Sequence, residues 1–166
     1  MHFDFEVRID RPVAEVFAYL TDVRNVPQWQ ESAVSADWID EGRRFREERH
    51  FMGRTAELEL EVTALEPERR FDVRAVKAPV KFEIRHSLEA LDGGTLVRVH
   101  GEAKLSGALR FAAGMVQKQA EGQFRRDFER MKSVLEETRR GLTPAVRSQR
   151  RDEESPSDRP PRLADE

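Results

Sequence analysis

The chain has 166 residues, no cysteine and a formal net charge of −3, and 37% of its residues are charged. This length predicts one domain, and the absence of cysteine excludes disulfides, thiolate catalysis and thiolate metal sites. The 29 basic and 32 acidic residues nearly balance, whereas a nucleic-acid binder normally carries a basic excess. No apolar run approaches the roughly 18 residues of a membrane span, and the N-terminus does not resemble a signal peptide. We therefore expect a cytoplasmic protein with no integral membrane segment and no nucleic-acid partner.

The N-terminal part predicts one strand followed by two short helices. Apolar and charged residues alternate from Phe3 to Ile9, which indicates a half-buried strand. Asp10 is then placed to cap a helix that has Pro12 in its first turn. A second short helical piece is expected to begin at Asp22 and to end at Trp29.

From residue 32 to residue 105 the apolar residues recur at every second position, which is typical of strands. Turn-forming residues divide this region, and proline takes its favoured second position in the turn at 66–69. The divisions predict six further strands in an antiparallel meander. The first four are expected at 32–39, 45–52, 55–65 and around 71–75, before the Ala78-Pro79 break, and the last two form a hairpin between residues 82 and 105.

The charges of this last hairpin favour one register. A loop at residues 93–94 gives three opposite-charge pairs on the outer face. A loop at residues 92–93 would instead place Glu83 opposite Glu102. We therefore expect the first register. Its three charge pairs are Glu89–Arg98, Arg85–Glu102 and Glu83–Lys104.

Residues 106–140 predict one long amphipathic helix, because their apolar residues recur at steps of three or four and the opposite side is charged. A single apolar stripe and a sheet with one apolar face are expected to pack together in two layers. The predicted fold is therefore α+β, with a curved antiparallel sheet of about seven strands around a long C-terminal helix. The stripe consists of Leu109, Ala113, Val116, Ala120, Phe124, Phe128, Met131 and Leu135.

Residues 141–166 differ in composition from the rest of the chain. They hold four of the eight prolines and few large apolar side chains, so they cannot bury enough surface to offset their ordering entropy. We expect a folded domain at 1–140 and a disordered charged tail at 141–166. A docking role for this tail is the alternative.

Four stretches of the sequence are similar to a known family. The strand followed by residues 11–22 (RPVAEVFAYLTD) and then 27–29 (PQW) resembles the start of the polyketide cyclase/dehydrase branch of the START-related (SRPBCC) superfamily. Residues 65–71 resemble the family's turn after its fourth strand, and residues 92–95 its last hairpin. The resemblance covers residues 2 to about 138.

This resemblance implies a helix-grip fold with a deep pocket between the sheet and the C-terminal helix. Members include aromatase/cyclases, lipid and quinone carriers and hormone receptors. They have no catalytic residue common to all, so the fold alone does not name an activity.

His86 is the main candidate for chemistry. In the expected register it lies on the inner face opposite Gly101, with Ala103 beside it, and these small residues would leave room for a ligand. An imidazole there could bond a ligand or transfer a proton near neutral pH. The alternative is a core histidine that is hydrogen-bonded to a neighbour.

Three charged residues are expected on the inner side. Alternation along 45–51 places Glu47 and Arg49 on the apolar face, which is costly unless they are paired or hydrated. They predict either a wet pocket with an internal ion pair or a bulge that turns them outward. Asp127 falls within the helix stripe and could partner Arg49 or His86, although we favour a slightly rotated stripe that leaves it at the margin.

Two apolar residues fall outside the stripe. Phe111 and Met115 are four residues apart on the far side of the helix, near Gly107 and Gly114. They indicate an irregular first turn, or else a homodimer contact or a membrane contact.

These observations predict a protein that binds an apolar or amphipathic small molecule, such as a lipid, quinone or polyketide. One alternative is a polyketide cyclase/dehydratase with His86 as acid/base and Arg49 stabilising an enolate oxygen. Another is an interaction module with a vestigial pocket. The sequence has no phosphate-binding loop and no metal-ligand spacing, so we expect neither cofactor nor metal. The expected ligand-binding residues are Trp29, Phe45, Glu47, Arg49, Phe82, Ile84, His86, Gly101, Val116, Ala120 and Phe124.

Overall fold

The computed structural model describes residues 1–51 and 53–141. The tail expected from 141 onward lies outside the described residues, except for Gly141, which is the last residue of the final helix. The predicted disorder of 142–166 therefore stays a prediction.

Seven strands form one antiparallel sheet in the order β1-β7-β6-β5-β4-β3-β2. All strands from β2 to β7 are neighbours in sequence order, and β1 closes the other edge by pairing with β7. This confirms the predicted meander. The strands are β1 (His2–Ile9), β2 (Ala33–Asp40), β3 (Arg44–Phe51), β4 (Arg54–Glu66), β5 (Arg70–Lys77), β6 (Lys81–Leu91) and β7 (Gly94–Lys104).

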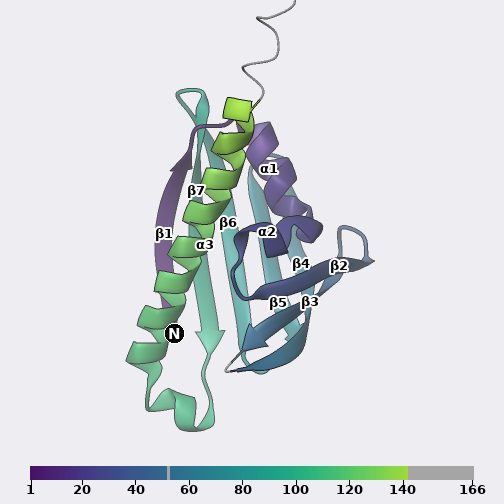
Figure 1. The fold of residues 1–166 in the computed structure, drawn as a ribbon. Coiled ribbons are helices and arrows are strands. Elements are labelled where there is room, and N and C mark those ends of the chain that lie inside the picture. The colour runs from purple at the N-terminus through teal and green to yellow at the C-terminus, as the bar shows by residue number, and fades with distance from the viewer. Residues whose placement is uncertain (52, 142–166) are drawn as a thin grey trace, which may run out of the picture.

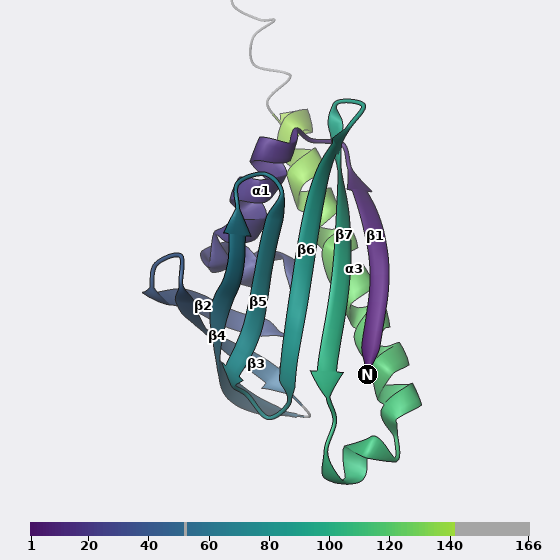
Figure 2. The ribbon, with the colours of Figure 1, turned by 180° about the vertical axis from the view of Figure 1, so that it is seen from behind.

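The helices all lie on one side of the sheet. The long helix α3 runs along β1 and β7, and α1 and α2 lie beside it (Figure 1). Seen from behind, the other face of the sheet is uncovered (Figure 2). The predicted α+β helix-grip architecture is confirmed. The helical segments are α1 (Val13–Thr21), η1 (Val23–Asn25), α2 (Val26–Trp29), η2 (Gly107–Arg110) and α3 (Ala113–Gly141).

The long helix begins later than predicted. The expected start at residue 106 is wrong, because η2 and a short turn come before α3. Gly107 has a φ of 58°, a left-handed conformation that glycine adopts without strain and that interrupts a helix. The 29 residues of α3 give a length of about 43 Å at 1.5 Å per residue. Phe111 consequently lies in the connection rather than on the helix.

The start of α1 also differs from the prediction. Its N-cap is Pro12, and no side chain caps the helix. The backbone N–H of Asp10 instead donates to Glu136 Oε1 at 2.8 Å, which ties the β1–α1 connection to α3. The second helical piece begins where expected, and there Asp22 Oδ1 accepts the backbone N–H of Arg24 at 3.2 Å at the start of η1.

The predicted register of the last hairpin is wrong. The loop consists of Asp92 and Gly93, with φ of 50° and 77°. Two successive left-handed residues make the turn whose twist matches paired strands, and an Asp-Gly sequence favours it. Gly94 belongs to β7, where a Cβ would lie 2.9 Å from the carbonyl oxygen of Ile9.

Turn geometry therefore outweighs the charge pairing that we expected. Glu83 does face Glu102, but each has another partner: Arg85 Nε donates to Glu83 at 2.7 Å, and His100 Nε2 lies 3.1 Å from Glu102 Oε1. The expected Glu89–Arg98 pair still forms, at 2.8 Å along a diagonal. Exposed ion pairs contribute too little to fix a register.

The core lies between the inner face of the sheet and α3. Phe128 is at its centre, with its ring 5.5 Å from that of Phe5 and 5.0 Å from that of Trp29. Met131 and Leu135 continue this contact along α3. The expected packing of a single helix stripe on a single sheet face is present.

Candidate functional site

Burial is uneven along the inner face. In the C-terminal half of α3, Phe128 and Met131 are fully buried, whereas Phe124 in the N-terminal half is only partly buried. The sheet shows the same change, because Ile84 is buried and Phe82 is partly exposed. We call the partly exposed apolar region the open end. It consists of Ala56, Phe82, Ala103, Val116, Ala120 and Phe124.

Glu47 and Arg49 form an internal ion pair beside the open end. Arg49 Nε donates to Glu47 Oε2 at 2.6 Å, and Arg49 Nη1 donates to Ser32 Oγ at 2.9 Å. A third bond runs from Arg49 Nη2 to Gln30 Oε1. Arg49 is paired with Ala56 in the β3–β4 register, so this residue lies beside one of the open-end residues. These bonds satisfy two charges that would otherwise be costly to bury.

The internal pair is therefore present, and the alternative of a bulge that turns it outward is not. The pairing of β3 with β4 is continuous from residue 44 to residue 51. The register shift nearby lies in β2, between Ala33 and Ser35. Glu47 is 3% exposed.

Asp127 is buried, so its expected position at the margin of the stripe is wrong. Its Oδ1 accepts the backbone N–H of Glu31 at 3.1 Å and the side-chain amide of Gln123 at 2.9 Å. Burial raises the pKa of Asp127, and these two bonds act in the opposite direction. Within the described residues neither Arg49 nor His86 forms an ion pair with it. Residues 30–32 thus connect β3, through Arg49, to α3, through Asp127.

His86 has the geometry of a core histidine. Its Nδ1 lies 2.6 Å from the carbonyl oxygen of Phe71. A carbonyl only accepts, so Nδ1 carries the proton and Nε2 is the free acceptor of the neutral ring. The ring packs 5.8 Å from the rings of both Phe71 and Phe128. Burial lowers the pKa of His86 to about 4, so the side chain is neutral at pH 7.

The space that we expected opposite His86 is filled. His86 faces Val99 in the observed register, and Gly101 faces Ile84. A Cβ on Gly101 would lie only 2.2 Å from Cζ of Phe3. The missing side chain therefore accommodates the ring of Phe3 rather than a ligand.

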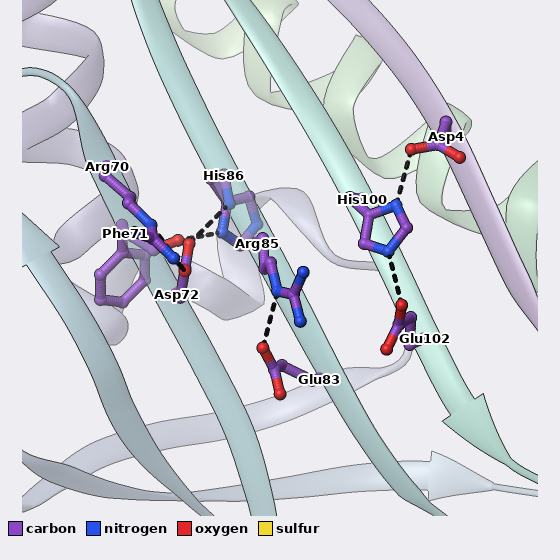
Figure 3. A network of polar contacts seen from close by, with 9 residues as sticks. All are labelled: Asp4, Arg70, Phe71, Asp72, Glu83, Arg85, His86, His100 and Glu102. Atoms are coloured by element: carbon purple, nitrogen blue, oxygen red, sulfur yellow. Dashed lines mark hydrogen bonds and ion pairs between the residues drawn. The ribbon is translucent and has the colours of Figure 1, made fainter.

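A polar network covers the outer face of the sheet behind His86 (Figure 3). Asp72, 1% exposed, accepts the backbone N–H of His86 at 3.3 Å and Nε of Arg70 at 2.8 Å. On β7, His100 lies between Asp4 at 2.7 Å and Glu102 at 3.1 Å. A hollow of about 490 Å³ lies on this face.

The sequence reasoning missed Asp72. Strand alternation assigns it to the outer face, where a charged residue is ordinarily exposed. Its burial arises from contacts with neighbouring strands, which the local pattern does not contain. The RFD sequence at 70–72 offered a weak signal, since an arginine two residues away on the same face can cover a carboxylate.

The predicted ligand-binding residues fall into two groups. Four of them belong to the open end, and Arg49, with its side chain 20% exposed, lies beside it. The others are buried in the core: Trp29, Phe45, Glu47, Ile84, His86 and Gly101. Trp29 Nε1 is buried and has no acceptor among the described residues.

Comparison with known proteins gives a family. The family model described as polyketide cyclase / dehydrase and lipid transport matches residues 1–136. The chain belongs to this family. The match confirms the resemblance seen in the sequence and covers nearly all of the region that carries it. No curated protein matches the chain.

Solved structures share the fold of this polyketide cyclase / dehydrase and lipid transport domain. A START superfamily protein from Mycobacterium smegmatis superposes with a TM-score of 0.69 at 18% identity, covering 82% of this chain and 98% of that one. TTHA0849 from Thermus thermophilus gives a TM-score of 0.73 at 16% identity, covering 83% and 99%. The di-domain ARO/CYC protein BexL from the BE-7585A biosynthetic pathway gives 0.69 at 18% identity, covering 82% of this chain and 46% of BexL. At these identities the likeness shows the fold.

Among the described residues, no helix is long and apolar enough to cross a membrane.

Proposed function

We propose that this domain binds an apolar or amphipathic small molecule at the open end, between the sheet and the first half of α3. The observation that carries the proposal is the unequal burial of one continuous apolar face. Phe128 and Met131 fill the space at one end, whereas Phe82, Ala120 and Phe124 stay partly exposed at the other. Apolar walls of this kind, with a few polar groups beside them, are the usual lining of small-molecule sites.

The polar cluster supports an amphipathic ligand. Arg49 pairs with Ala56 of the open end in the β3–β4 register, and its guanidinium is held in place by Glu47, Ser32 and Gln30. A fixed guanidinium orients a polar group at low entropic cost. The apolar part of such a ligand would contact Phe82 and the α3 side chains.

The family supports the same class of ligand. The family is described as polyketide cyclase / dehydrase and lipid transport, and polyketides and lipids both present large apolar surfaces.

Binding has more support than catalysis. The Nδ1 proton of His86 is donated to Phe71, and the pKa of about 4 removes the charged form at neutral pH. A general acid is most effective when its pKa lies near the working pH. The cyclase/dehydratase alternative would need His86 to act through Nε2 alone, beneath the rings of Phe71 and Phe128.

A fluorescence titration with the apolar probe anilinonaphthalene sulfonate tests the proposal. Ala120→Trp fills the open end, and we expect it to weaken probe binding about tenfold or more, which corresponds to at least ~1.4 kcal/mol. Ala14→Trp, on the exposed side of α1, is the matched control and should leave the affinity unchanged. Equal binding by both variants would place the probe elsewhere and contradict the proposal.

A further inference from the structure

We propose that one end of the molecule docks onto an anionic lipid bilayer. We call this surface the docking end. It lies where β6 begins, β7 finishes and the chain passes through η2 into α3, at the lower end of Figure 1. It consists of Lys81, Lys104, Arg110, Phe111, Met115 and Lys118.

Two large apolar side chains project from this end. Phe111 is 96% exposed and Met115 is 70% exposed, whereas the other exposed large apolar residues range from 37% to 48%. A nearly fully exposed phenylalanine gains no stability from its own fold. Exposed aromatic and aliphatic side chains beside basic ones are the pattern of a surface that inserts into a lipid interface.

The charges around these side chains have one sign. Lys81 lies directly opposite Lys104 in the β6–β7 register, and like charges in this position destabilise a sheet. Arg110 comes just before Phe111, and Lys118 lies one helical turn beyond Met115. Within the described residues, none of these four cations forms an ion pair, although seventeen other pairs are present.

The nearest carboxylates on β6 and β7 do not neutralise this end. Glu83 is bonded to Arg85, and Glu102 is bonded to His100. A cluster of unpaired cations on a chain of net charge −3 makes the charge distribution of the molecule asymmetric. An anionic surface therefore attracts this end and repels the remainder.

Docking would bring the open end to the lipid. Phe82 follows Lys81 in β6, Ala103 precedes Lys104 in β7, and Val116 follows Met115 in α3. A role in ligand exchange with the bilayer rests on the proposed function, whereas docking itself does not.

Vesicle co-sedimentation of the full chain tests the proposal. We expect binding to vesicles of mixed phosphatidylcholine and phosphatidylserine, weakened by salt, and none to phosphatidylcholine alone. Lys81→Gln with Lys104→Gln should lower the affinity roughly 25-fold, since each basic residue contributes roughly fivefold. Phe111→Ser with Met115→Ser should lower it about tenfold or more.

The matched controls lie at the end of β4 and in the turn that follows it, away from the docking end. Leu65→Ser removes an apolar side chain that is 48% exposed, and Arg69→Gln removes a charge from the exposed turn after this strand. Both should bind vesicles like the natural protein. All variants should bind anilinonaphthalene sulfonate at the open end as before, so failure of docking is distinguishable from failure of the proposed ligand site.

Three results would overturn the proposal. They are equal binding to neutral and anionic vesicles, binding that the docking-end substitutions leave unchanged, and no vesicle binding at all. If light scattering also shows a homodimer that Phe111→Ser dissociates, the surface joins two copies of the chain instead.

Discussion

The guanidinium of Arg49 holds together residues that are distant in sequence. It bonds Glu47 on its own strand, together with Ser32 and Gln30 from the segment that follows α2. Glu47 is almost fully buried, and Arg49 is the cation that bonds it. Removing one member of a buried pair leaves the other uncompensated, which costs more than the intact pair contributes.

We predict that Arg49→Met lowers the free energy of unfolding by about 3–5 kcal/mol. The double variant Glu47→Gln with Arg49→Met should recover at least half of this loss, because no unpaired charge is left. Urea unfolding followed by circular dichroism measures both. Arg46→Met, which breaks the exposed pair with Glu57, is the control and should cost at most ~1 kcal/mol. Equal losses for Arg46→Met and Arg49→Met would refute the buried pair.

His86 should make stability depend on pH. Burial lowers its folded-state pKa from 6.5 to about 4, so the folded protein favours the neutral ring. The stabilisation that results from this preference is complete above pH 6.5. As the pH falls from 6.5 toward 4, the free energy of unfolding decreases by roughly 3 kcal/mol in total. His86→Asn keeps a donor for the Phe71 carbonyl but does not titrate. In urea unfolding across this pH range, the free energy of unfolding of His86→Asn should change less than that of the natural protein.

The contribution of His100 to stability depends on pH in the opposite direction. Both of its ring nitrogens face carboxylates, first Asp4 and then Glu102, and these bonds raise its pKa. The contribution of His100 to the free energy of unfolding is complete below pH 6.5. It is lost as the pH rises through the raised pKa of the folded state. His100→Gln is therefore the matched control. Because His100 also lowers the pKa of Glu102, the control should leave the profile unchanged only between pH 6.5 and the range in which Glu102 titrates. A His86→Asn profile that parallels the natural protein would contradict the assignment.

At the scale of elements, the fit between β1 and β7 depends on one small residue. Phe3 faces Gly101 across the two strands, and its ring occupies the position where a Cβ would stand. The same ring lies 5.0 Å from that of Phe124 on α3. Gly101 therefore allows the edge strand, its neighbour and the helix to pack together.

We predict that Gly101→Ala destabilises the protein by about 1–3 kcal/mol, because it displaces the Phe3 ring from a packed position. Gly114→Ala, on the exposed side of α3 with nothing within 4 Å of its Cβ, should instead stabilise it by up to ~1 kcal/mol. Thermal unfolding compares the two variants. Shifts of the unfolding temperature in the same direction for both variants would contradict this packing. In a Phe3→Leu background, Gly101→Ala should destabilise the protein less, because the ring that it displaces is absent.

The elements themselves were largely predictable, because the periods of two and near four are local properties of the sequence. The register between neighbouring strands and the start of the long helix were not predictable from these periods. The hairpin register depended on the left-handed pair Asp92 and Gly93, and the charge pattern that we used contributes less energy than that turn. The start of α3 depended on the conformation of Gly107.

At the scale of the whole molecule, burial decreases from one end of the core to the other. The end where α3 finishes is closed by Phe128, Met131 and Leu135, and the end where it begins carries the open end and the docking end. The two proposals thus concern neighbouring surfaces. Together they describe a domain that takes up an apolar molecule at the end by which it touches a membrane.

The candidate site was predictable only in part. Alternation along β3 correctly placed Glu47 and Arg49 inside, since the inward face of a strand is a local property. Which of the inward residues stay accessible depends on where α3 lies across the sheet, and no local pattern contains that position. His86 and Gly101, expected to line the site, are for this reason in the packed half.

Native mass spectrometry of the purified protein, followed by denaturing extraction, tests the central claim most directly. We predict a bound lipid, quinone or aromatic polyketide on the natural protein and on Ala14→Trp, with its occupancy strongly reduced in Ala120→Trp. A protein that carries no such molecule, and that also fails to bind anilinonaphthalene sulfonate, would contradict the claim that the open end is a ligand site.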